Sequence, residues 1–135
     1  MKNYVLDANA LVRLFRDEPG ADTVDDLIRQ GKSGRVRIGM SVVNLAEVLC
    51  VLARFIGPEK ALLCTNKVRR VAEPFPVDEQ AAIDAGNLRI RYKLGLADCF
   101  ASELALRQDA TLVTADPDFA KLGKQLKILA LPRHS

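Results

Sequence analysis

Apolar residues along the chain fall into short β-prone runs that alternate with longer stretches at helical spacing. The first run stops at Asp7, and helical spacing follows it directly. By the same criterion we expect strands at 4–6, 35–38, 74–77, 111–114 and 127–131. Between them the pattern predicts helices at 10–15, 21–30, 42–55, 58–72, 78–93 and 96–107, with the strongly apolar 42–55 helix buried. This alternation predicts an α/β fold, a three-layer α/β/α sandwich with a short parallel sheet.

Length and composition are those of one soluble domain. The chain has 135 residues, 49% of them apolar, which suits a single domain over residues 1–135. Its longest unbroken apolar run, residues 48–53, is far shorter than the ~20 residues of a membrane-spanning helix. No signal-peptide pattern follows Met1. We interpret Cys50, Cys64 and Cys99 as buried thiols in a reducing compartment, so a cytoplasmic location is expected.

A shortage of histidine and aromatic residues narrows the possible chemistry. The one histidine is His134, in the last two residues, so zinc centres and Ser-His-Asp triads are not expected. Aromatic residues make up 5% of the chain, too few for the stacking platforms of single-strand binding modules. Acidic side chains are therefore the candidate reactive groups.

Four acidic residues lie where the predicted fold brings them together. Asp7 and Asp116 each follow a strand and emerge at the carboxyl edge of the sheet, where open α/β sheets bind ligands. Glu47 and Asp98 lie in apolar helical stretches, beside buried surface. Two carboxylates ~5 Å apart repel by about 3 kcal/mol at an effective dielectric of ~20, so such a cluster needs a cation. Oxygen ligands alone favour Mg²⁺ or Mn²⁺.

Each of these acids also has a purely structural interpretation. Asp7 could cap the helix that follows it, and Asp116, which precedes a proline, could cap another. Glu47 could complete a capping box with Asn44, and Asp98 could interact with a helix dipole. Four independent caps have no reason to converge on one end of one sheet, whereas a metal site requires it.

The segments around these acids resemble the PIN-domain pattern, in particular that of VapC-type toxin ribonucleases of bacterial and archaeal toxin-antitoxin pairs. In order, they read DANA at 7–10, NLAEVL at 44–49, GLADC at 95–99 and TADPDF at 114–119. The resemblance spans residues 3 to about 131. It implies that Mg²⁺ or Mn²⁺ is held by Asp7, Glu47, Asp98 and Asp116, with the Thr114 hydroxyl beside the last acid. Asn9 departs from the pattern, because many members carry Ser or Thr there.

The resemblance also implies an RNA substrate and a small antitoxin protein as partner, and we expect a homodimer. A metal-activated water would hydrolyse the phosphodiester and leave a 5′-phosphate and a 3′-hydroxyl. Asp7, Asp98 and Asp116 are expected as direct ligands, with Glu47 as a ligand or as the group that orients the water. Outside these four acids the chain has 20 basic residues against 13 of its 17 acidic ones, a surplus of +7 that favours a polyanionic substrate.

Two other functions stay open on this sequence. The same fold could serve a DNA or flap-structure nuclease, or a non-catalytic PIN-like domain that binds RNA or a protein. A haloacid-dehalogenase-type phosphatase would need a second aspartate where Asn9 stands. Product analysis on defined RNA and DNA, with and without Mn²⁺, separates these functions.

Overall fold

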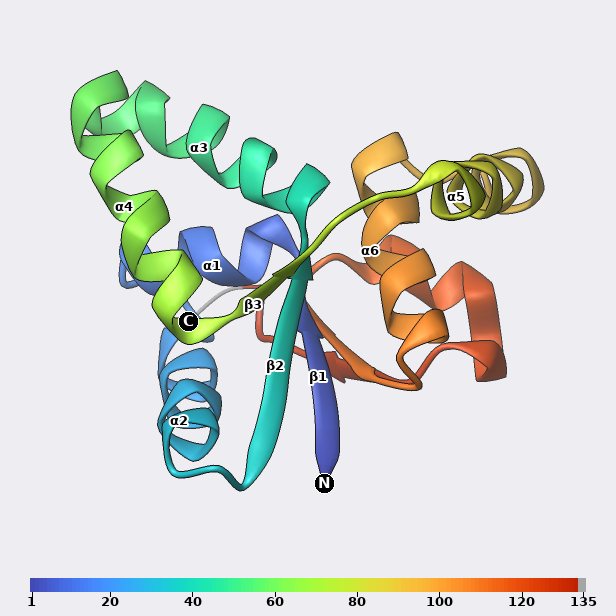
Figure 1. Ribbon diagram of the computed structural model, residues 1–135, viewed down its shortest axis with the longest axis horizontal. Coiled ribbons are helices and arrows are strands. Elements are labelled where there is room, and N and C mark those ends of the chain that lie inside the picture. Colours follow the sequence, from blue (N-terminus) through green and yellow to red (C-terminus); the bar gives the residue numbers. More distant parts are fainter. Residues whose placement is uncertain (134–135) are drawn as a thin grey trace.

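A computed structural model, which describes residues 1–133, contains a five-stranded sheet with helices on both faces (Figure 1). The strands are paired in the order β3-β2-β1-β4-β5, and every neighbouring pair is parallel. Their bounds are β1 (Lys2–Leu6), β2 (Val36–Ser41), β3 (Glu73–Phe75), β4 (Thr111–Thr114) and β5 (Ile128–Ala130). The predicted α/β sandwich is confirmed. His134 lies outside the described residues.

Six α-helices and one 3₁₀ segment cover the two faces of the sheet. One face carries α1 (Ala8–Phe15), α2 (Ala21–Lys32), α3 (Val42–Ile56) and α4 (Pro58–Val71), as Figure 1 shows. The other carries α5 (Glu79–Tyr92), α6 (Leu96–Arg107) and the 3₁₀ segment η1 (Pro117–Gln125). Because side chains alternate along a strand, Val5 packs into the core under α5 and α6, whereas Leu6 packs under α1 to α4.

The direction of winding reverses at β1. From β1 the chain proceeds through β2 to β3 at one edge, and it then crosses to β4 on the other side of β1. The ends of β1 and β4 are therefore followed by connections that leave in opposite directions, toward α1 and η1. A crevice at such a switch point is the usual ligand site of an open α/β sheet.

The structure corrects the expected burial of α3 and of two cysteines. Asn44, Val48 and Leu52 face the core at four-residue spacing, so only one face of α3 is buried. Cys50 lies about half a turn from Val48 and Leu52 and is exposed; Cys64 is half-buried, and only Cys99 is buried as expected. The prediction of a buried helix therefore holds for one face of α3 only, because its other side faces away from the core.

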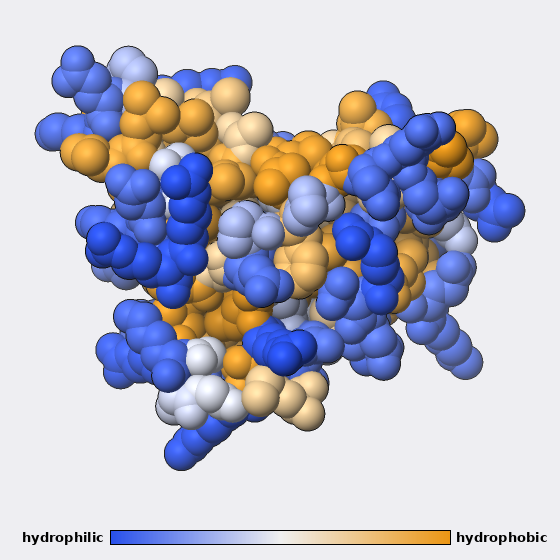
Figure 2. All heavy atoms as spheres, viewed as in Figure 1, coloured by the Kyte–Doolittle hydropathy of each residue, from blue (hydrophilic) through white to orange (hydrophobic). Residues whose placement is uncertain are grey.

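Besides the single residues Met1 and Leu106, exposed large apolar side chains among residues 1–133 gather at two places. Phe55 and Ile56 at the end of α3 lie near Leu62 and Leu63 of α4 in the sequence, and these four side chains are 40–66% exposed. Figure 2 shows apolar side chains gathered over this α3–α4 end of the molecule, at the upper left of the view. The second place comprises Ile83 and Ile90 of α5 and Leu96 at the start of α6. Neither set contributes to the two buried cores.

No helix among residues 1–133 combines the length and the apolar character needed to cross a membrane.

Candidate active site

Asp7 ends the central strand and caps the helix that follows. Its Oδ1 accepts the backbone N–H of Ala10 at 2.8 Å, which confirms the capping interpretation. Its Oδ2 accepts the Thr114 hydroxyl. The side chain is only 3% exposed. The cap uses Oδ1 alone. Oδ2, which accepts the Thr114 hydroxyl, is the oxygen that can also accept from, or coordinate, a further group at the switch point.

The Thr114 hydroxyl links the ends of β1 and β4. It donates to Asp7 and accepts the backbone N–H of Asp116 at 3.0 Å. The Asp116 carboxylate in turn accepts the N–H of Asp118 at 2.9 Å and caps η1, as predicted for an aspartate before a proline. Thr114 therefore holds Asp7 and the Asp116 backbone in fixed relation across two neighbouring strands.

Glu47 and Asp98 enter from α3 and α6. The N-cap of α3 is Ser41, so Asn44 lies within the first turn and the proposed capping box of Asn44 and Glu47 does not form. Asn44 is instead fully buried, and its Nδ2 donates to the Ala97 carbonyl at 3.2 Å and to Glu47 Oε1 at 3.5 Å. It thus connects Glu47 to the start of α6, where Asp98 lies in the first turn as expected.

The four predicted acids are brought together. Asp7, Glu47, Asp98 and Asp116 all line one hollow of about 510 Å³ at the carboxyl edge of the sheet. Asn9, Arg13 and Arg133 lie on its wall. Among residues 1–133 none of the four carboxylates forms an ion pair with a basic side chain. Within this described part of the chain, no salt bridge therefore compensates the charge of the four carboxylates.

Burial, with a smaller contribution from repulsion, disfavours the charged forms of Asp7 and Asp98. Burial raises the pKa of Asp7 from its ordinary 3.8 to about 7, against the hydrogen bonds from Thr114 and Ala10, which lower it, and with smaller upward contributions from the charges of Asp98 and Glu47. Burial also raises the pKa of Asp98, to about 6, followed by the charges of Asp116, Glu47 and Asp118. The pKa values of Asp7 and Asp98 are therefore raised partly by the charges of their acidic neighbours.

The donor set fits a hard, hydrated cation. In the described part of the chain no three acidic, histidine or cysteine side chains converge tightly enough to enclose an ion as they stand. Mg²⁺ keeps several of its waters and takes only a few protein carboxylates, so an open arrangement of oxygens suits it. A cation would also relieve the repulsion that raises the pKa of Asp7 and Asp98.

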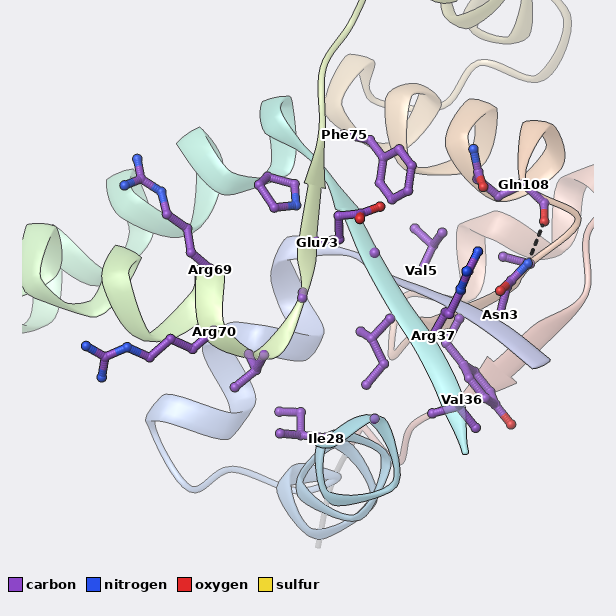
Figure 3. Close-up of a pocket in the computed structure, with 18 of the residues that line it drawn as sticks. Asn3, Val5, Ile28, Val36, Arg37, Arg69, Arg70, Glu73, Phe75 and Gln108 are labelled. Atoms are coloured by element: carbon purple, nitrogen blue, oxygen red, sulfur yellow. Dashed lines mark hydrogen bonds between the residues drawn. The ribbon is translucent and has the colours of Figure 1, made fainter. Parts of the chain in front are cut away.

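A second hollow, of about 600 Å³, lies at the other end of the sheet and lacks comparable chemistry (Figure 3). It is lined by the early residues of β1 and β2 and by β3. Figure 3 shows Arg69 and Arg70 pointing outward, away from Arg37, so these arginines do not converge on one ligand. We therefore place the candidate active site in the carboxylate hollow.

Some residues of the site were not predicted from the sequence. The contact of Asn44 with α6 joins positions 53 residues apart, and the hydrogen bonds of Arg13 to Pro132 and Arg133 join positions 119 and 120 apart. Apolar periodicity carries no information about such contacts. Asn44 stood out in the sequence as a polar residue in an apolar helix and as part of the 44–49 segment, but neither signal indicated a contact with α6.

Comparison with known proteins identifies the family of the chain. The model of the PIN domain family matches residues 4–125. No curated protein matches the sequence significantly.

Solved structures of the same fold include toxin-antitoxin proteins. A structure of VapBC2 from Rickettsia felis bound to a promoter DNA fragment has a TM-score of 0.73 at 19% identity, and the match covers 95% of this chain and 98% of that one. The structure of DNA-bound VapBC from Salmonella typhimurium has a TM-score of 0.73 at 20% identity, and the match covers 96% of this chain and 98% of that one. VapC20 from Mycobacterium tuberculosis is a toxin that cleaves the sarcin-ricin loop. Its structure has a TM-score of 0.72 at 16% identity, and the match covers 89% of this chain and 95% of that one. At these identities the likeness concerns the fold.

We predict that Asp98→Asn stabilises the metal-free protein above pH 6. The folded-state pKa of Asp98 exceeds its ordinary 3.8, so the folded state binds more protons than the unfolded state between about pH 4 and 6. The stability of the parent protein therefore falls as pH rises through this range, and the neutral amide removes that fall. Thermal melts in EDTA at pH 4 and pH 8 measure the difference.

Asp22→Asn is the matched control, because Asp22 is also a first-turn aspartate but is exposed on α2, away from the hollow. It should lose about 0.3–1 kcal/mol of helix-dipole interaction at pH 8. If Asp98→Asn lost stability at pH 8 as the control does, Asp98 would be an ordinary first-turn residue.

Proposed function

The chain belongs to the PIN domain family, and we propose that it is a Mg²⁺- or Mn²⁺-dependent endoribonuclease, the toxin of a toxin-antitoxin pair, acting in the cytoplasm as a single nuclease domain over residues 1–135. The observation that carries this proposal is the convergence of four carboxylates, without a basic partner, in one hollow. A domain that only bound RNA or a protein would gain nothing from this repulsion. VapC20, which shares the fold, is a toxin that cleaves the sarcin-ricin loop, and this supports RNA as the substrate class.

Three aspartates and one glutamate divide the work of the site. Asp7, Asp98 and Asp116 would hold the cation, which when bound supplies an activated water and neutralises charge on the phosphodiester. The Thr114 hydroxyl, which donates to Asp7 Oδ2, would fix the orientation of that carboxylate. Glu47, whose Oε1 accepts from Asn44, keeps Oε2 free to orient the attacking water or to serve as a further ligand. Attack on phosphorus releases the 3′-oxygen and leaves a 5′-phosphate.

We predict cleavage of single-stranded RNA in Mn²⁺ or Mg²⁺ and none in excess EDTA. Asp98→Asn should lower the rate at least ~10²-fold, because it removes a group that fixes the cation where charge develops. Asp22→Asn should cleave at the parent rate. Defined RNA and DNA oligonucleotides, with the product ends mapped, provide the measurement. Full cleavage in EDTA would contradict the mechanism, and cleavage of DNA alone would assign the site to a DNA or flap-structure nuclease.

The toxin proposal requires two protein interfaces, one for an antitoxin and one for a second copy of the chain. The two sets of exposed apolar side chains, at the α3–α4 end and on α5 with Leu96, supply surface for both. An antitoxin would also gain from placing a cationic side chain in the carboxylate hollow, because nothing basic is paired there among residues 1–133.

Expression of the chain alone should slow the growth of its host, whereas Asp98→Asn should not. Co-expression with the small protein encoded beside it should restore growth and yield a complex on purification. The isolated Asp98→Asn protein should have twice the 14.8 kDa chain mass by light scattering. Normal growth without any co-purifying small protein would contradict the toxin proposal, and a monomeric mass would contradict the homodimer.

A further inference from the structure

The segment after β5 returns to the carboxylate hollow. The Leu131 N–H donates to the Thr114 carbonyl at 2.7 Å, and the Leu131 side chain is 4% exposed in the core shared with α1 and α2. A Cβ on Gly20 would lie 3.0 Å from Leu131 Cβ, and Gly20 has a φ of +94°, so the turn before α2 fits closely around this segment. The path places Arg133 on the wall of the hollow.

Arg13 of α1 fixes this segment. Its Nη1 donates to the carbonyl oxygens of Pro19 and Pro132 at 2.7 and 2.8 Å, and its Nη2 donates to the Arg133 carbonyl at 3.4 Å. Its Nε donates to Asn9 Oδ1 at 2.9 Å. Asn9 therefore orients Arg13. It lacks the hydroxyl of the Ser or Thr that many family members carry at this position.

The two arginines give the hollow a positive rim above a negative floor. All four acceptors of Arg13 are neutral oxygens, and within residues 1–133 neither arginine forms an ion pair. Asp7 is buried, whereas Arg13 is half-buried and Arg133 is exposed, so the positive charges lie nearer to solvent. A nucleic-acid strand suits this arrangement of charges. When one phosphodiester lies at the carboxylates, the neighbouring phosphates of the strand can lie at the arginines.

On the basis of the proposed function, we propose that Arg133 binds a phosphate next to the cleaved bond of the RNA and that Arg13 is the positioning residue that holds it there. An arginine can contact a phosphate through two parallel N–H groups, which fixes the orientation of the strand as well as its distance. By donating to the Pro132 and Arg133 carbonyl oxygens, Arg13 fixes the backbone from which the Arg133 side chain extends.

Removal of the Arg133 side chain tests the contact. Arg133→Ala should raise KM for single-stranded RNA about 5- to 10-fold with little change in kcat. A contact away from the reacting atoms stabilises the bound ground state and the transition state equally. The slope of log Kd against log salt should fall by about 0.7, the value for one phosphate of a single strand. Anisotropy with Asp98→Asn as background measures Kd without cleavage. Arg133→Lys should retain most of the slope.

Two further variants separate contact, positioning and bulk charge. Lys127→Ala removes an exposed charge just before β5, at the opposite edge of the sheet, and should change neither KM nor the salt slope. Arg13→Gln should raise KM as Arg133→Ala does. The double variant should raise KM little beyond either single variant, because both substitutions remove the same contact of Arg133 with the phosphate. Melting curves verify that each variant is folded.

The outcomes distinguish this inference from the proposed function. If the parent cleaves RNA and Arg133→Ala matches Lys127→Ala, the proposed contact is wrong while the nuclease stands. A faster Arg133→Ala would show that the segment blocks the site, and weaker binding of the antitoxin without change toward RNA would assign the rim to the protein partner; either result overturns the proposal. If the parent does not cleave, the proposed function fails, and the salt slopes still decide whether Arg133 contacts a polyanion.

Discussion

Asp7 occupies a position where an ionised carboxylate is hard to keep. It is 3% exposed at the end of the central strand, next to the charges of Asp98 and Glu47. A pKa raised from 3.8 to about 7 corresponds to about 4 kcal/mol against the ionised form. The hydrogen bonds from Ala10 and Thr114 offset only part of the cost of burial. The surrounding fold must supply the remainder.

The elements around Asp7 explain how the fold tolerates this arrangement. Two layers of helices bury the sheet on both faces, and the core under α1 to α4 reaches from Leu6 to Leu131. Thr114 joins β1 to the turn after β4, and Asn44 joins α3 to α6. Each of these contacts fixes an acid or its neighbour by a hydrogen bond to an element on the far side of the crevice. The repulsion is thus built into a rigid scaffold and is available to be relieved by a cation.

Local signals in the sequence were sufficient for the fold. The β-prone runs 4–6 and 111–114, the period-two alternation at 35–38 and the proline that opens α4 each predicted an element that the structure has. The candidate site was also accessible, because a parallel sheet brings the ends of β1 and β4 together whatever else the chain does.

Contacts between distant segments could not be predicted in this way. Ser41 caps α3, as a helix predicted to begin at residue 42 requires, but the link from the buried Asn44 to the Ala97 carbonyl at the start of α6 was not predicted. The exposure of Cys50 depends on which face of α3 meets the core, which an almost uniformly apolar sequence does not specify. The meeting of Arg13 with the Pro132 carbonyl depends on the path after β5, for which no periodicity exists. Apolar pattern encodes elements, whereas such polar contacts depend on their final packing.

Burial and, to a smaller extent, repulsion favour the protonated forms of Asp7 and Asp98 until a cation replaces the protons. Calorimetric titration of the protein with Mn²⁺, in buffers of different ionisation enthalpy, counts the protons released on binding. With pKa values of about 7 for Asp7 and about 6 for Asp98, we expect release at pH 6 that declines toward zero at pH 8, together with tighter binding at the higher pH. Absence of Mn²⁺ binding, or binding at pH 6 without proton release, would contradict the account.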